Sequence, residues 1–156
     1  MTDDMLVSPA STTTPEPSTQ PVLALRPVSE AMHPGVITCH PGATLRDVAR
    51  MMANVGIHAV VVWGDEEDDS EGVWGIVSDL DLVTAAARGE QLAGPAVGAA
   101  RTEVVTVRGR ASLLHAAHLM EQHGVTHLVV LADDRDRPIG ILSTLDVARA
   151  LARATS

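Results

Sequence analysis

The sequence contains an internal repeat, and this feature constrains the fold more than any other. Residues 36–62 align with residues 104–130 at an offset of 68 positions. Past an acidic loop the offset falls to 65, so that residues 75–81 align with residues 140–146. A small length difference in a loop is the kind that folds tolerate. The chain is therefore predicted to contain two copies of one structural unit.

Each copy has the same predicted order of elements. A short β-rich run (36–39 and 104–107) precedes a helix whose apolar residues recur at i, i+3, i+4 and i+7, the spacing of one buried helix face. Two continuously apolar strands follow, as expected for strands buried on both faces, and a last helix closes the copy. The predicted strands are 58–63, 73–78, 127–131 and 139–143, and the closing helices are 80–88 and 145–154.

The repeat predicts how the copies associate. One copy of about 60 residues is only marginally stable alone, because a small domain buries too little surface. We expect an α+β fold of two β-α-β-β-α repeats related by a pseudo-twofold axis, with the sheets packed together and the helices outside. This arrangement forms a cleft between the copies, and the axis forms that cleft twice. The repeats span residues 28–95, which include a linker, and 96–156. Residues 1–27 lack apolar periodicity and are expected to form a disordered tail.

Composition excludes several classes of function. The net charge is −9, and the chain has two Trp but no Phe or Tyr. Such a chain offers neither a phosphate-binding surface nor a base-stacking platform, so nucleic acid is not an expected partner. No apolar run approaches the roughly 20 residues that a membrane helix needs, so we expect no membrane association. A single cysteine, Cys39, fits a reducing compartment, and we expect the protein to be cytoplasmic.

Catalytic and metal-binding patterns are missing from the sequence. There is no nucleophile elbow, P-loop or dinucleotide fingerprint, so no residue is assigned a catalytic role and no enzymatic activity is expected. His115 and His118 have the spacing of two metal ligands, but the equivalent residues of the first copy, Asp47 and Arg50, belong to a polar helix face. We therefore predict no metal site and no tightly held cofactor.

One motif ends the last strand and begins the last helix of both copies: glycine, two aliphatic residues, Ser, two further residues and Asp. The glycine allows another group to approach the backbone closely. The Ser at the N-cap and the Asp three residues later can form a capping box. The same Asp can also accept a hydrogen bond from a hydroxylated ligand such as a ribose. Two copies do not decide between these interpretations, because both helices need a cap.

This twin pattern resembles a pair of CBS (cystathionine β-synthase) domains in the tandem arrangement called a Bateman module. The resemblance extends from about residue 28 to residue 154. It implies a non-catalytic regulatory module that binds an adenosine-type ligand (AMP, ADP, ATP or S-adenosylmethionine) in the cleft between the repeats. It also implies a homodimer and an effector protein that responds in trans. The alternative is a ligand-free structural or protein-interaction module.

The resemblance also implies which residues contact the ligand. The acid of the motif binds the ribose, its serine lies near the phosphate, and a threonine of the first strand lines the adenine and ribose side. A His-Arg pair often meets the phosphates, but here each copy keeps one imidazole and neither keeps the arginine, so ligands with little negative charge fit better. The candidate ligand-binding residues are Thr38, His58, Ser78, Asp81, Thr106, His127, Ser143 and Asp146.

Overall fold

The predicted order of elements is present in both repeats, and further elements precede the first. The computed structural model describes residues 18–64 and 72–154. In chain order the elements are α1 (Thr19–Ala24), α2 (Val28–Ala31), β1 (His33–Pro34), β2 (Thr38–Cys39), α3 (Leu45–Val55), β3 (Ala59–Trp63), β4 (Val73–Ser78), α4 (Asp79–Ala87), the 3₁₀ helix η1 (Ala96–Gly98), β5 (Thr106–Arg108), α5 (Leu113–His123), β6 (His127–Leu131), β7 (Pro138–Ser143) and α6 (Thr144–Ala154).

Helices α3 and α5 show how the repeated sequence becomes repeated structure. Each begins after a hydroxyl residue, Thr44 or Ser112, whose side chain accepts a hydrogen bond from the backbone N–H three residues later. Each ends at a glycine with positive φ, Gly56 or Gly124. That left-handed conformation favours glycine because other residues place a Cβ too close to the backbone. Both predicted helices are confirmed, including their starts and stops.

Each repeat supplies a sheet with the same local connectivity. The first sheet has the order β2-β3-β4 and the second the order β1-β7-β6-β5. In each, the short first strand runs parallel to the second and the hairpin partner runs antiparallel. The registers correspond as well, since Thr38 pairs with Val61 and Thr106 pairs with Val129. The pseudo-twofold relation predicted from the sequence is therefore present in the strand pairing.

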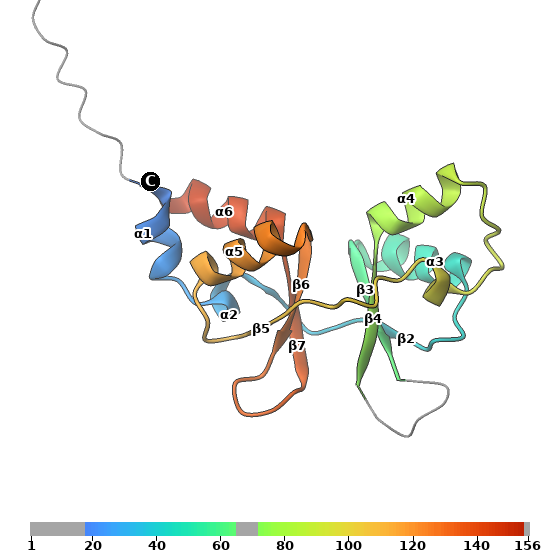
Figure 1. Cartoon of the computed structure of the whole chain (residues 1–156), viewed down its shortest axis with the longest axis horizontal. Coiled ribbons are helices and arrows are strands. Elements are labelled where there is room, and N and C mark those ends of the chain that lie inside the picture. Colours follow the sequence, from blue (N-terminus) through green and yellow to red (C-terminus); the bar gives the residue numbers. More distant parts are fainter. Residues whose placement is uncertain (1–17, 65–71, 155–156) are drawn as a thin grey trace, which may run out of the picture.

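The two sheets pack against each other at the centre of the molecule (Figure 1). Val61 of β3 and Val129 of β6 lie in one buried cluster that joins the sheets. Val60 and Val62 point the other way, into the core beneath the helices of the first repeat. Side chains alternate across a strand, so a strand buried on both faces must be apolar throughout. The predicted α+β architecture, with helices on the outside, is confirmed.

The segment that leads into each repeat packs on the opposite repeat, a feature that the sequence did not reveal. β1 pairs with β7 through His33 and Ile141, and the equivalent Arg101 bridges to Ile76 of β4. Figure 1 shows the two connections crossing between the halves. The predicted ranges 28–95 and 96–156 thus describe the sequence repeats, whereas in space each repeat exchanges its leading segment with the other.

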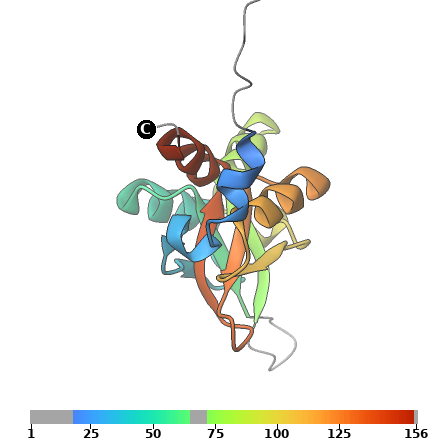
Figure 2. The same cartoon turned by 90° about the vertical axis from the view of Figure 1, so that its left-hand side faces the viewer.

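The N-terminal region differs from the disordered tail predicted for residues 1–27. Residues 1–17 lie outside the described part, but residues 19–24 form α1, which lies against α5 and α6 (Figure 2). Leu23 of this helix is 5% exposed and belongs to the core of the second repeat. A single apolar turn is too short to show periodicity, and its stability comes from tertiary packing. The prediction was wrong for this segment.

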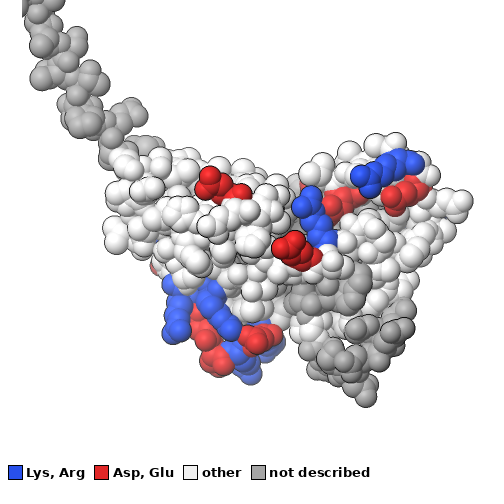
Figure 3. All heavy atoms as spheres, viewed as in Figure 1, with Lys and Arg blue, Asp and Glu red and all other residues white. Residues whose placement is uncertain are grey.

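Charged side chains of both signs are mixed on the face seen in Figure 3, most densely at the tip of the β6–β7 hairpin. There Arg108 binds Asp136 at 2.6 Å and donates to the carbonyl oxygens of Ala132 and Arg135. Such mixed charge does not form a basic surface on this face. Among the helices in the described ranges, none is long and apolar enough to cross a bilayer.

Candidate functional site

The carboxylates of Asp81 and Asp146 stand in the first turns of α4 and α6, and both close a capping box. Oδ2 of each accepts hydrogen bonds from the backbone N–H (2.8 Å) and the hydroxyl (2.9 Å) of the preceding serine, Ser78 or Ser143. The serine Oγ in turn accepts a bond of 3.2 Å from the aspartate N–H. The capping interpretation is therefore correct for one oxygen of each carboxylate. It leaves Oδ1 for other partners.

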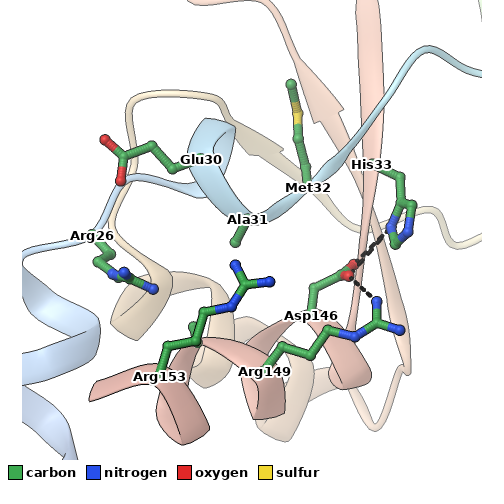
Figure 4. A pocket seen from close by; sticks show the side chains of 9 residues that line it. Arg26, Glu30, Ala31, Met32, His33, Asp146, Arg149 and Arg153 are labelled. Carbon is green, nitrogen blue, oxygen red and sulfur yellow. Dashed lines mark hydrogen bonds and ion pairs between the residues drawn. The ribbon is translucent and has the colours of Figure 1, made fainter. Parts of the chain in front are cut away.

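The second oxygen of each carboxylate faces a basic side chain from the crossing segment. Nε of Arg101 lies 3.5 Å from Oδ1 of Asp81. Nδ1 of His33 lies 3.2 Å from Oδ1 of Asp146 and 3.3 Å from its Oδ2 (Figure 4). His33 and Arg101 are equivalent positions of the repeat. Arg149, one turn along α6, places Nη1 3.6 Å from Oδ1 of Asp146. The side chain of Asp146 is 2% exposed and that of Asp81 is 11% exposed.

The glycine of each motif admits the backbone of the crossing segment. A Cβ placed on Gly140 would lie 2.5 Å from the carbonyl oxygen of His33, and one on Gly75 would lie 3.0 Å from that of Arg101. The close approach predicted for this glycine is therefore made by the chain itself. As a result, His33 and Arg101 are held next to the aspartates of the motifs.

Two equivalent clefts lie between the repeats. Cleft A is lined by residues 33–37 and 55–59 together with His127, Ile141, Ser143 and Asp146, and its volume is about 390 Å³. Cleft B is divided into two parts that share Arg101, Glu103, Val105 and Val125. One part, of about 60 Å³, is lined also by Ile76, Ser78, Leu80, Asp81 and residues 124–127, and the other, of about 320 Å³, is lined also by Ala100, Thr102 and His123. The pseudo-twofold axis thus produces a cleft twice, as predicted, but cleft A is one continuous cavity whereas cleft B is divided.

The division of cleft B follows from residues of the crossing segments. Cleft B has Arg101 and Glu103 where cleft A has His33 and Gly35. Two long charged side chains therefore replace an imidazole and a hydrogen atom. Pockets that bury a small molecule typically measure about 300–1,000 Å³. Cleft A reaches that size beside its motif aspartate, whereas the part of cleft B that contains Asp81 measures about 60 Å³.

Two histidines of the site, His58 and His127, lie near the carboxylate of Asp79. Nδ1 of His58 lies 2.8 Å from Oδ2 of Asp79, and this hydrogen bond holds the pKa of Asp79 below its usual value. His127 lines both clefts, and burial lowers the pKa of its imidazole, against the opposing pull of the Asp79 charge. His127 is thus neutral at physiological pH. Cleft A therefore presents the carboxylate of Asp146 and the neutral imidazole of His127.

The structure brings together six of the eight candidate residues. Cleft A contains His58, His127, Ser143 and Asp146, and cleft B contains Ser78, Asp81 and again His127. Thr38 and Thr106 are exposed on β2 and β5 and line neither cleft. The residues just before them, Ile37 and Val105, line the clefts instead.

The sequence analysis missed His33 and Arg101 because their placement depends on the exchange of leading segments. One signal was available. At the offset of 68, His33 falls on Arg101, so a basic side chain precedes the first β-rich run of both repeats. Neither residue lies in a recognised motif, and only the crossing of the chain brings each one to an aspartate of the other repeat.

Comparison with solved structures finds the same architecture in several proteins. The CBS domain pair of protein MJ0100, in complex with 5′-methylthioadenosine and S-adenosyl-L-methionine, is 20% identical, with a TM-score of 0.71 over 83% of this chain and 98% of that one. The CBS domain protein PAE2072 from Pyrobaculum aerophilum, complexed with AMP, is 27% identical, with a TM-score of 0.68 over 84% and 100%. No curated protein matches the sequence.

A third similar structure contains a metal. Hypoxic Response Protein I, with two coordinated zinc ions, is 25% identical, with a TM-score of 0.62 over 80% of this chain and 98% of that one. In residues 18–64 and 72–154 of the present chain, no group of three or more His, Cys, Asp or Glu side chains is placed to hold a metal ion.

The family model of the CBS domain matches the sequence at two places, residues 28–88 and residues 97–153. These ranges coincide with the two repeats and together cover most of the chain. Each contains one helix-capping motif and contributes one aspartate to the clefts described above. By sequence and by architecture alike, the chain belongs to the CBS domain family and carries two of its domains in tandem.

Proposed function

We propose that the chain is a regulatory CBS pair that binds an adenosine-type ligand in cleft A. One observation carries the proposal: cleft A, at about 390 Å³, combines apolar side chains such as Ile37 and Ile57 with Ser143 and Asp146. Binding sites for small molecules have this character, an apolar wall with a few polar groups that fix orientation. A purine suits the apolar residues, and ribose hydroxyl groups need an acceptor such as a carboxylate.

We propose that Asp146 accepts the hydrogen bonds of the ribose hydroxyl groups. Its Oδ2 closes the capping box, and its Oδ1 contacts His33, whose side chain is 67% exposed. An exposed imidazole moves at little cost, so a ribose hydroxyl can take its place at Oδ1. Because the cap uses the other oxygen, α6 keeps its N-terminal hydrogen bonds when ligand binds.

The charge of the cleft favours the adenosine part of a ligand over a phosphate chain. Among the described residues that line cleft A, none is Arg or Lys. His58 is already paired with Asp79, whose carboxylate repels phosphate. Cleft A by itself therefore prefers adenosine, AMP and S-adenosylmethionine to ATP. The complex of PAE2072 with AMP, at 27% identity, supports an adenosine-type ligand.

Binding in cleft A would connect the two repeats. Residues 55–59 come from the first repeat, whereas Ile141, Ser143 and Asp146 come from the second. A ligand that contacts both favours one relative placement of the repeats, which is the form that regulation by population shift takes. We further propose that the cytoplasmic protein is a homodimer without catalytic activity and that an effector protein reads this shift in trans.

The test is a thermal-shift and calorimetric titration of the full chain with adenosine, AMP, ADP, ATP and S-adenosylmethionine. A ligand at about 100 times its Kd stabilises the fold by about 2.7 kcal/mol, which a melting curve resolves. Asp146→Asn should weaken binding at least about tenfold, since a hydrogen bond to a charged group contributes roughly 1.5–3 kcal/mol. Asp81→Asn is the matched control, because it alters the same cap in cleft B and should leave binding unchanged.

Two results would contradict the proposal. If none of the five compounds shifts the melting curve, the ligand-free interaction module is the better description. If Asp81→Asn weakens binding and Asp146→Asn does not, the ligand occupies cleft B, and the argument from the continuous volume of cleft A fails.

A further inference from the structure

A second cavity adjoins cleft A and shares His33 and Asp146 with it. This cavity, called the Arg pocket here, has a volume of about 180 Å³. Three guanidinium groups line it, those of Arg26, Arg149 and Arg153. Arg26 comes from the turn after α1, and the other two come from one face of α6, four residues apart (Figure 4). Segments far apart in the sequence thus place three cations around one hollow of a chain whose net charge is −9.

These cations are poorly neutralised. Within the described part of the chain, Arg26 and Arg153 have no ion pair, and the carboxylate of Glu30 points away from them in Figure 4. Arg149 reaches Asp146 only at 3.6 Å, too far for a direct hydrogen bond. Like charges four residues apart on a helix destabilise it. The arrangement therefore leaves guanidinium N–H groups available as hydrogen-bond donors. It also leaves positive charge that a bound anion would neutralise.

The internal repeat supplies a comparison. The residues equivalent to Arg26, Arg149 and Arg153 are Gly94, Thr84 and Arg88. A cation at the end of a helix is favourable for any helix, which accounts for Arg88 and Arg153 alike. Arg26 and Arg149 have no basic counterpart in the other repeat. The convergence of three arginines thus belongs to one side only, the side of the open cleft A.

We propose that the Arg pocket binds phosphate groups. The guanidinium group is a planar fork that donates two parallel hydrogen bonds to phosphate oxygens, and its charge is permanent. The phosphate belongs either to a free anion such as pyrophosphate or to a nucleotide whose adenosine lies in cleft A. The free-anion case is independent of the proposed function, whereas the nucleotide case rests on it.

The experiment titrates the full chain with three probes: inorganic pyrophosphate, AMP and adenosine. The test variant is Arg26→Gln with Arg153→Gln, and the control is Arg88→Gln, which changes the equivalent of Arg153 on the other side. We expect the test variant to weaken binding of a phosphate-bearing probe at least about tenfold, and the control to bind like the wild type. A variant with lysine at positions 26 and 153 keeps the charge but loses the bidentate geometry, and it should bind with intermediate affinity.

The probes separate the two sources of phosphate. If AMP binds more tightly than adenosine and the test variant abolishes that difference, the nucleotide phosphate reaches the Arg pocket. If pyrophosphate binds in an arginine-dependent way while AMP and adenosine bind equally, the pocket takes a free anion. Absence of adenosine binding counts against cleft A but leaves the pyrophosphate result intact. The inference is overturned if the test variant, with the wild-type melting temperature, changes neither pyrophosphate binding nor the difference between AMP and adenosine.

Discussion

Arg101 covers Asp81: its Nε atom lies 3.5 Å from Oδ1 of the carboxylate, and both residues line cleft B. In cleft A the equivalent pair is His33 and Asp146, with a shorter side chain in place of the guanidinium group. The two repeats therefore keep the same pairing of a basic residue with the motif aspartate and differ in how much space the basic residue fills. Since Glu103 also replaces Gly35, the small volume of the part of cleft B beside Asp81, about 60 Å³, follows from two side chains.

This relationship predicts that cleft B can be opened. The double variant Arg101→His and Glu103→Gly gives cleft B the residues of cleft A at the two positions that narrow it. We expect the number of AMP molecules bound per chain, measured by calorimetry, to rise from one in the wild type to two in the variant. Asp81→Asn added to this double variant is the control and should restore one. A stoichiometry of one in the double variant would show that the two side chains do not control access.

The motif glycines predict an order of stabilities. In Gly140→Ala the new methyl group would meet the carbonyl oxygen of His33 at 2.5 Å and Sδ of Met32 at 2.7 Å, so the backbone must move. In Gly75→Ala its nearest neighbour is the carbonyl oxygen of Arg101 at 3.0 Å, a milder conflict. We expect Gly140→Ala to lower the free energy of unfolding by about 1–3 kcal/mol and Gly75→Ala to lower it less. Urea unfolding of both variants measures this, and the reverse order would contradict the geometry.

Local features of the fold could be predicted from the sequence because local physics determines them. Thr44 and Gly56 bound α3 through side-chain and backbone conformations that each residue type favours alone. The strand around Val61 had to be buried on both faces because it is apolar at every position. The inter-repeat clefts followed from having two copies, since a pseudo-twofold axis forms any cleft twice.

Features that depend on long-range packing could not be predicted. The exchange of leading segments brings His33 and Arg101 to the opposite repeats, and no local pattern encodes that crossing. The Arg pocket depends on it as well, because Arg26 precedes β1 and accompanies it to the second repeat. The two aspartates of the motif remained ambiguous for a different reason. One carboxylate can close a cap and face a cleft at the same time.

Helix α1 gives a prediction about the N-terminal region. Leu23 is 5% exposed against the second repeat, whereas Leu25, two residues later, is 85% exposed. Leu23→Ala should lower the free energy of unfolding by about 2 kcal/mol, since it empties space in a packed core. Leu25→Ala is the matched control and should change it by less than about 0.5 kcal/mol. Equal midpoints of urea unfolding for both variants would mean that α1 does not contribute to the core.

Exposed apolar side chains on α4 and α6 predict where the proposed homodimer forms. Val83 of α4 is 63% exposed and Leu145 of α6 is 51% exposed, and both helices lie along the upper side of the molecule in Figure 1. Exposed apolar patches on one side of a molecule mark association surfaces. Val83→Glu with Leu145→Glu should convert dimers into monomers in sedimentation velocity. Leu92→Glu, at a 53% exposed residue between α4 and η1, should leave the mass unchanged. A dimer that survives the double variant would place the contact elsewhere.

His127 predicts how stability depends on pH. Burial lowers the pKa of this imidazole below its usual value, although the charge of Asp79 opposes the shift and His58 adds to it. Between the lowered value and the ordinary value of about 6.5, the unfolded chain binds a proton that the folded chain does not, so the free energy of unfolding decreases as the pH falls through that window. Urea unfolding at about pH 7.5 and about pH 5.5 should show a smaller decrease in His127→Gln than in the wild type. His118→Gln, at an exposed histidine of α5, should show the wild-type decrease. If the free energy of unfolding decreases equally in all three proteins, burial does not destabilise the charged form of His127.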